Sequence, residues 1–237
     1  RLEMDYPDDT EMRVSCETIY ESLYLQARGE LRTQLKLALR TGRARRVPRS
    51  RAQRPHGQIQ GMVNISERPP EHSDRAVPGN LEGDLIIGKG SKSQIASLVD
   101  RNSRFTVLVR IPYDRTADRV AGLLARKMES LPEFLKKSIT WDQGKEMARH
   151  ADFTVKSGIP VYFCDPHSPW QRGTNENTNG LLRQYFPKGT DLSLHTQAEL
   201  DTVAMELNGR PRKTLGWKAP AEVYQEMLKG ACVGLIA

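Results

Sequence analysis

Three short segments rich in β-branched and aliphatic residues follow one another closely in the middle of the chain, and we predict strands at 81–88, 94–100 and 105–111. Short turns join them, which favours an antiparallel meander. Apolar segments with helical and extended patterns then alternate. They predict helices at 116–131, 145–157 and 174–185, strands at 138–141 and 160–164, and later helices at 196–207 and 220–228. The order β-β-β-α-β-α-β-α predicts a mixed α/β sheet.

Asp84 lies inside an otherwise apolar predicted strand, which reads Leu81-Glu82-Gly83-Asp84-Leu85-Ile86. An ionised carboxylate in such a strand is costly unless it is paired or bound to a metal. Residues two apart share one face of a strand, so Glu82 points the same way as Asp84. We interpret Asp84 as a metal-binding carboxylate and Glu82 as a residue that supports it.

Two further acids lie at the ends of predicted elements. Asp142 follows the strand 138–141 and precedes a Gln-Gly turn, a position that suits a ligand crevice. Glu176 falls in the first turn of the helix 174–185. Each also has a structural interpretation, because Asp142 could cap a helix and Glu176 could interact favourably with a helix dipole.

The three acids are more informative together than singly. Between Asp142 and Glu176 lie 33 residues. In a sheet of this order, we expect Asp84, Asp142 and Glu176 to converge at one edge. Three carboxylates can hold two divalent cations roughly 4 Å apart, and their oxygens favour Mg²⁺ or Mn²⁺ over zinc. Two such ions activate a water or a 3′-hydroxyl and stabilise the leaving oxygen of a phosphodiester.

Positive charge is concentrated near the N-terminus of this chain, whose formal net charge is +7. Ten basic residues, opposed there only by Glu30, lie close together: Arg28, Arg32, Lys36, Arg40, Arg43, Arg45, Arg46, Arg49, Arg51 and Arg54. Such a run is either a solvated tail or a phosphate-binding arm. Because it borders other DNA-related features, we favour the arm, with Arg43, Arg45 and Arg46 as candidates for DNA contact.

Four zones can be separated along the chain. Residues 1–41 look helical, with Ser15 as a predicted N-cap, and their pattern resembles a partial helix-turn-helix that presents Arg13 and Thr18 to DNA. An ordinary helical hairpin would look the same. The prolines of residues 42–80 predict an extended linker, whose apolar patch at 61–65 we expect to dock on the next domain. Residues 81–228 form the predicted core, and 229–237 a tail.

Two classes of protein are disfavoured by the sequence. No run of eighteen apolar residues occurs, so we expect no membrane span and a cytosolic location. Cys16, Cys164 and Cys232 are far apart, which argues against a disulfide framework and against a structural zinc site.

Long motifs around the acids carry a resemblance to a known family. They are residues 75–86, Trp141-Asp142-Gln143-Gly144-Lys145-Glu146, Gln171-Arg172-Gly173-Thr174-Asn175-Glu176-Asn177, residues 185–191, and Asn208-Gly209-Arg210-Pro211-Arg212-Lys213-Thr214-Leu215-Gly216-Trp217. These motifs resemble the insertion sequence 30 family of DDE transposases, which are similar to retroviral integrases. The resemblance covers nearly the whole chain.

The resemblance implies a ribonuclease H-like catalytic core that cleaves and joins DNA at insertion-sequence ends. It implies two Mg²⁺ or Mn²⁺ ions bound by the catalytic acids Asp84, Asp142 and Glu176, and a homo-oligomer on DNA in the bacterial cytosol. The first helix of the family's helix-turn-helix would lie upstream of Arg1. Two alternatives stay open: a structure-selective nuclease of the same fold that cuts without joining, and an inactive DNA-binding remnant. The intact acids argue against the remnant.

Other polar residues near these motifs are candidates for supporting roles. Glu146, one turn beyond Asp142, could support the site, and His167 could assist proton transfer or be merely an exposed loop residue. Asn175 and Asn177 flank Glu176 and could bond phosphate or cap the turn. Candidates for contact with the DNA backbone are Lys145, Arg172, Arg210, Arg212 and Lys213. For Arg172, a surface salt bridge is an equally good interpretation.

Overall fold

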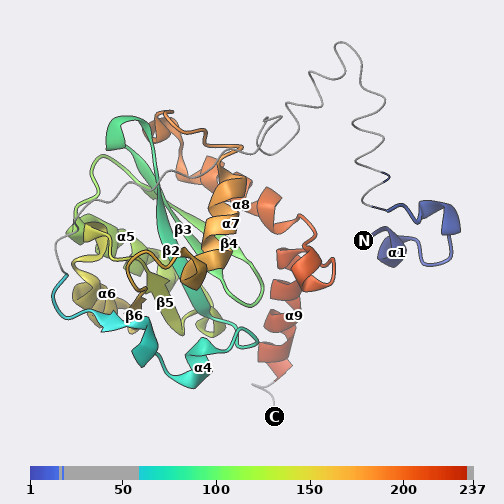
Figure 1. The fold of residues 1–237 in the computed structure, drawn as a ribbon, viewed down its shortest axis with the longest axis horizontal. Helices are drawn as coiled ribbons and strands as arrows, with labels where there is room; N and C mark the ends of the chain where they lie inside the picture. The colour runs from blue at the N-terminus through green and yellow to red at the C-terminus, as the bar shows by residue number, and fades with distance from the viewer. Residues whose placement is uncertain (16–17, 19–58, 234–237) are drawn as a thin grey trace. The chain divides into compact units, whose positions relative to one another are not determined.

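The computed structural model describes residues 1–15, 18 and 59–233, with side chains up to residue 230 (Figure 1). The chain divides into two compact units, Arg1–Arg54 and Pro55–Ala237. In the first unit, short helical turns occur at α1 (Leu2–Asp5) and Thr10–Met12. The Ser15 hydroxyl accepts the Thr18 backbone N–H at 3.0 Å, as an N-cap does. The predicted helices beyond Thr18, at 19–24 and 29–40, lie outside the described residues.

A mixed six-stranded sheet forms the centre of the second unit, with strand order β1-β6-β5-β2-β3-β4. Its antiparallel meander consists of β2 (Asn80–Ile87), β3 (Gln94–Asp100) and β4 (Thr106–Ile111). β5 (Ser138–Trp141) runs parallel to β2, and β6 (Val161–Phe163) runs parallel to β5. All five predicted strands are therefore confirmed, and no strand end differs from its prediction by more than one residue.

The sixth strand comes from the segment that we predicted to be linker. β1 (Val63–Asn64) pairs in parallel with β6, so the apolar patch docks by adding an edge strand. The Asn64 side chain donates a hydrogen bond to Asp165 at 2.9 Å, which fixes this segment beside the loop that follows β6. A short helix, α4 (Pro70–Ser73), leads from there towards β2. The part of residues 42–80 that is described thus packs on the sheet.

Helices cover both faces of the sheet (Figure 1). One hydrophobic core lies between the sheet and α5 (Ala117–Glu129) with α6 (His150–Ser157). The other lies between the sheet and α7 (Gly173–Leu182) with α8 (Gln197–Asn208). α9 (Pro220–Val233) follows, and its Tyr224 ring stacks on Phe105 with centroids 4.2 Å apart. Since α9 continues to Val233, residues 229–233 of the expected tail are helical.

The helix predicted at 145–157 is interrupted, and the helix predicted at 174–185 ends early, at Leu182. Instead of a single helix over 145–157, a 3₁₀ turn at Lys145–Met147 precedes α6. The ring of His150 lies 3.2 Å from the Met147 carbonyl and 3.0 Å from the Gly61 carbonyl, so it occupies an acceptor that a continuous helix would use. α6 ends as predicted at Gly158, which adopts a left-handed φ of 72°.

No helix in the described ranges is both long and apolar enough to cross a membrane. Cys164 is a free, buried thiol, and burial raises its pKa to about 11. Cys16 and the side chain of Cys232 lie outside the description.

Candidate active site

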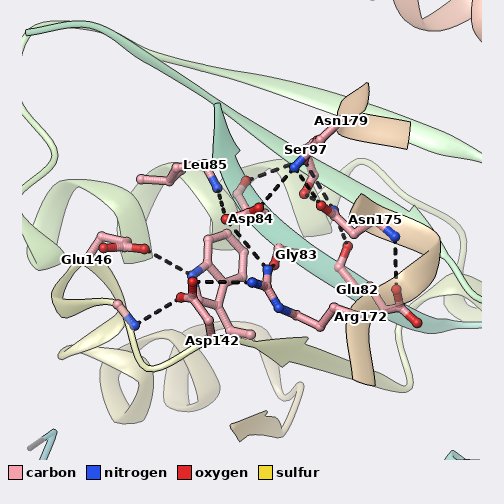
Figure 2. Close-up of polar contacts among 12 residues, drawn as sticks. Glu82, Gly83, Asp84, Leu85, Ser97, Asp142, Glu146, Arg172, Asn175 and Asn179 are labelled. Carbon is pink, nitrogen blue, oxygen red and sulfur yellow. Dashed lines mark hydrogen bonds and ion pairs between the residues drawn. The ribbon is translucent and has the colours of Figure 1, made fainter. Parts of the chain in front are cut away.

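Asp84 lies on β2 where the strand is covered by α7 (Figure 2). Its side chain is one quarter exposed, at 25%. Asp84 Oδ1 accepts the Leu85 backbone N–H at 2.8 Å, and Asp84 Oδ2 accepts from the Asn179 amide at 3.0 Å. Burial raises the pKa of Asp84 to about 6; the Arg172 charge opposes this rise and the Asp142 charge adds to it. This carboxylate is therefore costly to ionise in the absence of further positive charge.

Asp142 approaches Asp84 because β2 and β5 are parallel neighbours. Glu82 pairs with Thr140 in this register, so two residues further along both strands Asp84 and Asp142 come side by side. Asp142 Oδ1 accepts the Gly144 backbone N–H at 2.9 Å, and the side chain is 43% exposed. Asp142 thus ends its strand as predicted, at an accessible edge of the sheet.

The Arg172 guanidinium lies between these two carboxylates (Figure 2). It donates to the Gly83 carbonyl at 2.7 Å and to Asp142 Oδ2 at 3.2 Å, and lies 3.5 Å from Asp84 Oδ1. Although burial works in the opposite direction, the charges of Asp84 and Asp142 raise the pKa of Arg172. Arg172 is only 8% exposed, so the expectation of a surface salt bridge is wrong. It is an internal counterion of the acid pair.

Glu176 occupies the first turn of α7, as predicted, and its side chain is exposed. The expected convergence of three acids is not seen, because within the described ranges no group of three acidic, histidine or cysteine side chains is placed to hold a metal ion. Asp84 and Asp142 come together, whereas Glu176 stays apart from them. Its part in the site stays a prediction.

Two asparagines of α7 face β2 in its place. Asn175 is fully buried: its backbone N–H donates to Glu82 Oε2 at 2.9 Å, and its side-chain amide donates to the Glu82 carbonyl at 2.9 Å and the Ser97 carbonyl at 3.1 Å. Asn179 bonds Asp84, as described above. The expectation that Asn175 could contact phosphate is therefore wrong; it anchors the helix to the sheet.

The match between strand and helix spacing explains this arrangement. Residues two apart on a strand are about 6.7 Å apart, and residues four apart on a helix are about 6 Å apart. Glu82 and Asp84 can therefore meet Asn175 and Asn179 in register. Acids two residues apart on a strand, together with asparagines four residues apart on a later helix, are a sequence pattern that predicts this contact. Arg172 carries no comparable signal.

The supporting residues that we predicted are distributed unevenly. Glu82 is fully buried and pairs with Arg101 at 3.3 Å, so it lies directly beneath the site. Glu146 accepts from the Trp141 indole at 3.3 Å, next to Asp142 (Figure 2). His167 is exposed, with a left-handed φ of 61°, and Lys145 is exposed on its 3₁₀ turn.

The basic residues near the end of α8 have different surroundings. Arg210 pairs with Glu206 at 2.6 Å and contacts the Tyr185 hydroxyl and ring. Arg212 donates to the Leu207 carbonyl at 3.2 Å, and Lys213 is exposed. In the first unit, Arg13 and Thr18 are exposed, while the arginine candidates at 43, 45 and 46 lie outside the described residues.

The acid pair suits a hard divalent cation. Mg²⁺ is commonly held in proteins by one or two carboxylates together with water and substrate phosphates. Asp84 and Asp142 supply two such carboxylates at an accessible edge. The pair already neutralises the positive charge of the buried Arg172 side chain. The raised pKa of Asp84 also favours a bound cation, because a cation stabilises the ionised carboxylate.

Comparison with known proteins agrees with this interpretation of the fold. The family model described as "Integrase core domain" matches residues 74–169, a range that contains Asp84 and Asp142. The transposase for insertion sequence element IS1086 of Cupriavidus metallidurans is 54% identical over 96% of this chain and 67% of its own length. The transposase InsI for IS30A of Escherichia coli is 48% identical over 92% of this chain and 57% of its own length.

A more distant relative is the transposase for IS4351 of Bacteroides fragilis, which is 38% identical over 91% of this chain and 65% of its own length. Among solved structures, the catalytic core domain of BIV integrase gives a TM-score of 0.47 at 21% identity and covers 64% of this chain and 96% of that domain. The chain spans between about half and two thirds of the length of these transposases.

The mixed sheet carries Asp84 inside β2 and Asp142 just after the neighbouring β5, within the range that matches an integrase core domain. Among proteins with that domain, the chain belongs to the insertion-sequence transposase family that includes the IS1086 and IS30 transposases.

Proposed function

We propose that this chain cleaves and joins DNA strands at the ends of an insertion sequence. The acid pair Asp84 and Asp142 holds the divalent metal, and Glu176 is the third catalytic acid. The observation that carries the proposal is the approach of Asp84 and Asp142 across the parallel pair β2 and β5, with the buried guanidinium of Arg172 between them. The substrates are DNA containing the terminal inverted repeats of the element and target DNA, and the acting form is a homo-oligomer on DNA.

The residues of the chain divide the work as follows. Asp84 and Asp142, whose side chains are 25% and 43% exposed, would hold the cation. Asn179 donates to one oxygen of Asp84, and the Gly144 backbone N–H donates to one oxygen of Asp142, so each carboxylate has a hydrogen bond that restricts its rotation. Bound Mg²⁺ would supply Lewis-acid activation of the attacking hydroxyl and stabilisation of the leaving oxygen.

Arg172 sets the electrostatics of this site. In the absence of metal, its guanidinium offsets the repulsion between Asp84 and Asp142. It is also bonded to the Gly83 carbonyl, so it stays anchored to β2 if the carboxylates turn towards a metal. Lying at the start of α7, Arg172 links the acid pair to the helix that carries Glu176.

Substitution of the acids tests the proposal. We expect Asp84→Asn, Asp142→Asn and Glu176→Gln each to lower Mg²⁺-dependent strand cleavage and joining at least about a thousandfold, because each removes a charge that the metal site needs. DNA binding without metal should be retained. Glu129→Gln, at the exposed end of α5, is the matched control and should keep full activity. Near-normal activity in any acid variant would remove that acid from the site.

Joining distinguishes a transposase from a nuclease of the same fold. Pre-cleaved element ends incubated with plasmid and Mg²⁺ should give joined products. Cleavage without joining would contradict the proposed function even if all three acids proved essential.

A further inference from the structure

A basic pocket lies beside the first turn of α7, apart from the acid pair. It has a volume of about 300 Å³, and its walls include Arg75, Arg104, Arg212, Thr174, Thr178 and Asn177. None of the residues that line this pocket is acidic. Three arginines and three threonine hydroxyls therefore surround one cavity whose lining carries no negative charge.

The fold builds this pocket from four separate segments. The Asn102 side chain, in the turn between β3 and β4, donates to the carbonyls of Arg75 at 3.1 Å and Ala76 at 2.9 Å. This holds the Arg75 loop against the turn that carries Arg104. The Arg104 guanidinium in turn donates to the Thr174 hydroxyl at the start of α7. The cavity wall is therefore fixed by hydrogen bonds rather than by a mobile surface chain.

Arg104 is held at some cost. Its backbone has a left-handed φ of 62°, which is unfavourable for a residue with a long side chain and is often found where function requires it. Burial lowers the pKa of Arg104 and the charge of Arg75 lowers it further, while the charges of Glu82 and Asp100 partly oppose this. Among the described residues, neither Arg75 nor Arg104 forms an ion pair with an acidic side chain. A bound anion would offset this repulsion.

The pocket and the acid pair lie on different faces of one helix. Successive helical residues turn by about 100°, so Thr174 and Thr178 share the pocket face while Asn175 and Asn179 face β2. With side chains, a helix is about 10–12 Å across. A DNA strand carries one charge about every 3.4 Å along its axis, so the two faces can contact different phosphates of one strand.

We propose that this pocket binds one backbone phosphate of the DNA substrate, a different one from the phosphodiester at the acid pair. Guanidinium groups match phosphate oxygens in a forked geometry, and the Thr174 hydroxyl, which accepts from Arg104, has its own proton left to donate. The inference rests on the proposed function, since it takes DNA as the substrate. It assigns Arg75 and Arg104, neither of which stood out in the sequence, to DNA positioning.

The salt dependence of DNA binding tests the pocket. Affinity of the full chain for duplex DNA is measured without divalent metal at several salt concentrations, for the wild type, Arg75→Gln, Arg104→Gln and the double variant. One phosphate contact accounts for about 0.9 of the slope of log affinity against log salt. We expect each single variant to bind about tenfold more weakly at low salt and to lose up to that slope. The double variant should lose no more, because both arginines serve one phosphate.

Arg126→Gln on α5 is the matched control, because it removes the same charge from an exposed site on the opposite face of the sheet. The proposal is overturned if Arg75→Gln and Arg104→Gln bind DNA as Arg126→Gln does. Circular dichroism checks the fold of each variant. If Arg104→Gln fails to fold, Arg75→Gln, whose side chain is exposed, decides the question.

A parallel titration with inorganic phosphate separates two sources of the same ligand chemistry. If the arginine variants lose phosphate binding but keep wild-type DNA affinity, the pocket takes a free anion and its assignment to DNA is wrong. The outcome is independent of the acid variants, which are tested by cleavage. Loss of DNA affinity in the arginine variants would stand even if the chain proved unable to cleave.

Discussion

Two polar clusters lie next to each other between β2 and α7, and each joins a carboxylate, an arginine and an asparagine. The sealed cluster consists of Glu82, Arg101 and Asn175, all of them 6% exposed or less. The open cluster consists of Asp84, Asp142, Arg172 and Asn179, and its two aspartates are 25% and 43% exposed. The two clusters contain the same kinds of side chain and differ in the solvent exposure of their carboxylates.

The difference shows how one strand face can provide both structure and a binding site. Glu82 meets only protein groups, so its charge holds α7 on the sheet. Two residues further along, Asp84 reaches the edge where β5 ends, and its oxygens are accessible to a ligand. Burial raises its pKa, and a bound cation would lower that pKa by stabilising the ionised carboxylate. Substitution of Glu82 should therefore destabilise the fold, whereas substitution of Asp84 should not.

The largest change in stability should follow from Glu82→Gln. This variant leaves the buried Arg101 without its carboxylate partner, and breaking a buried pair in this way costs about 3–5 kcal/mol. Urea unfolding of the metal-free protein at neutral pH measures the loss. Glu129→Gln, an exposed change of the same kind, should stay within about 0.5 kcal/mol of the wild type. An equally small effect of Glu82→Gln would mean that the sealed cluster does not hold the helix.

Asp84→Asn should have a smaller effect and the opposite sign. The folded-state pKa of Asp84 is about 6, against an ordinary 3.8, so the folded protein binds this proton more tightly than the unfolded chain does. The resulting stabilisation is complete below about pH 3.8 and is lost as the pH rises through 6. The loss is on the order of 3 kcal/mol by pH 7.5.

Because an asparagine side chain cannot ionise, the Asp84→Asn variant avoids that loss. Urea unfolding in the presence of a chelator should find Asp84→Asn more stable than the wild type at pH 7.5, with a smaller difference at pH 4.5. A variant that is less stable at pH 7.5, or a difference that does not change with pH, would contradict the assignment of a strained carboxylate at this position.

Much of the sheet could be predicted from the sequence because its strands are long or strongly patterned. β3 and β5 were predicted with the bounds that the structure has. β1 was missed as a strand because two residues are too few to show a periodicity, and their pairing with β6 depends on contacts about one hundred residues away. The break before α6 likewise depends on a contact between His150 and the distant Gly61.

The candidate site was predictable in part for the same reason. Asp84 and Asp142 stand out locally, as an acid in an apolar strand and an acid at a strand end. The buried position of Arg172 depends on contacts with Gly83 and Asp142, which are 89 and 30 residues away, and no local pattern reveals it. Arg75 and Arg104 meet only through the fold.

Calorimetric titration of the full chain with Mn²⁺ tests the central claim most directly, because it measures the metal site without requiring DNA. The wild type and Glu129→Gln should bind the ion alike, while Asp84→Asn and Asp142→Asn should each bind at least about tenfold more weakly. The account would be contradicted if both aspartate variants, shown to be folded, bound Mn²⁺ as tightly as the wild type.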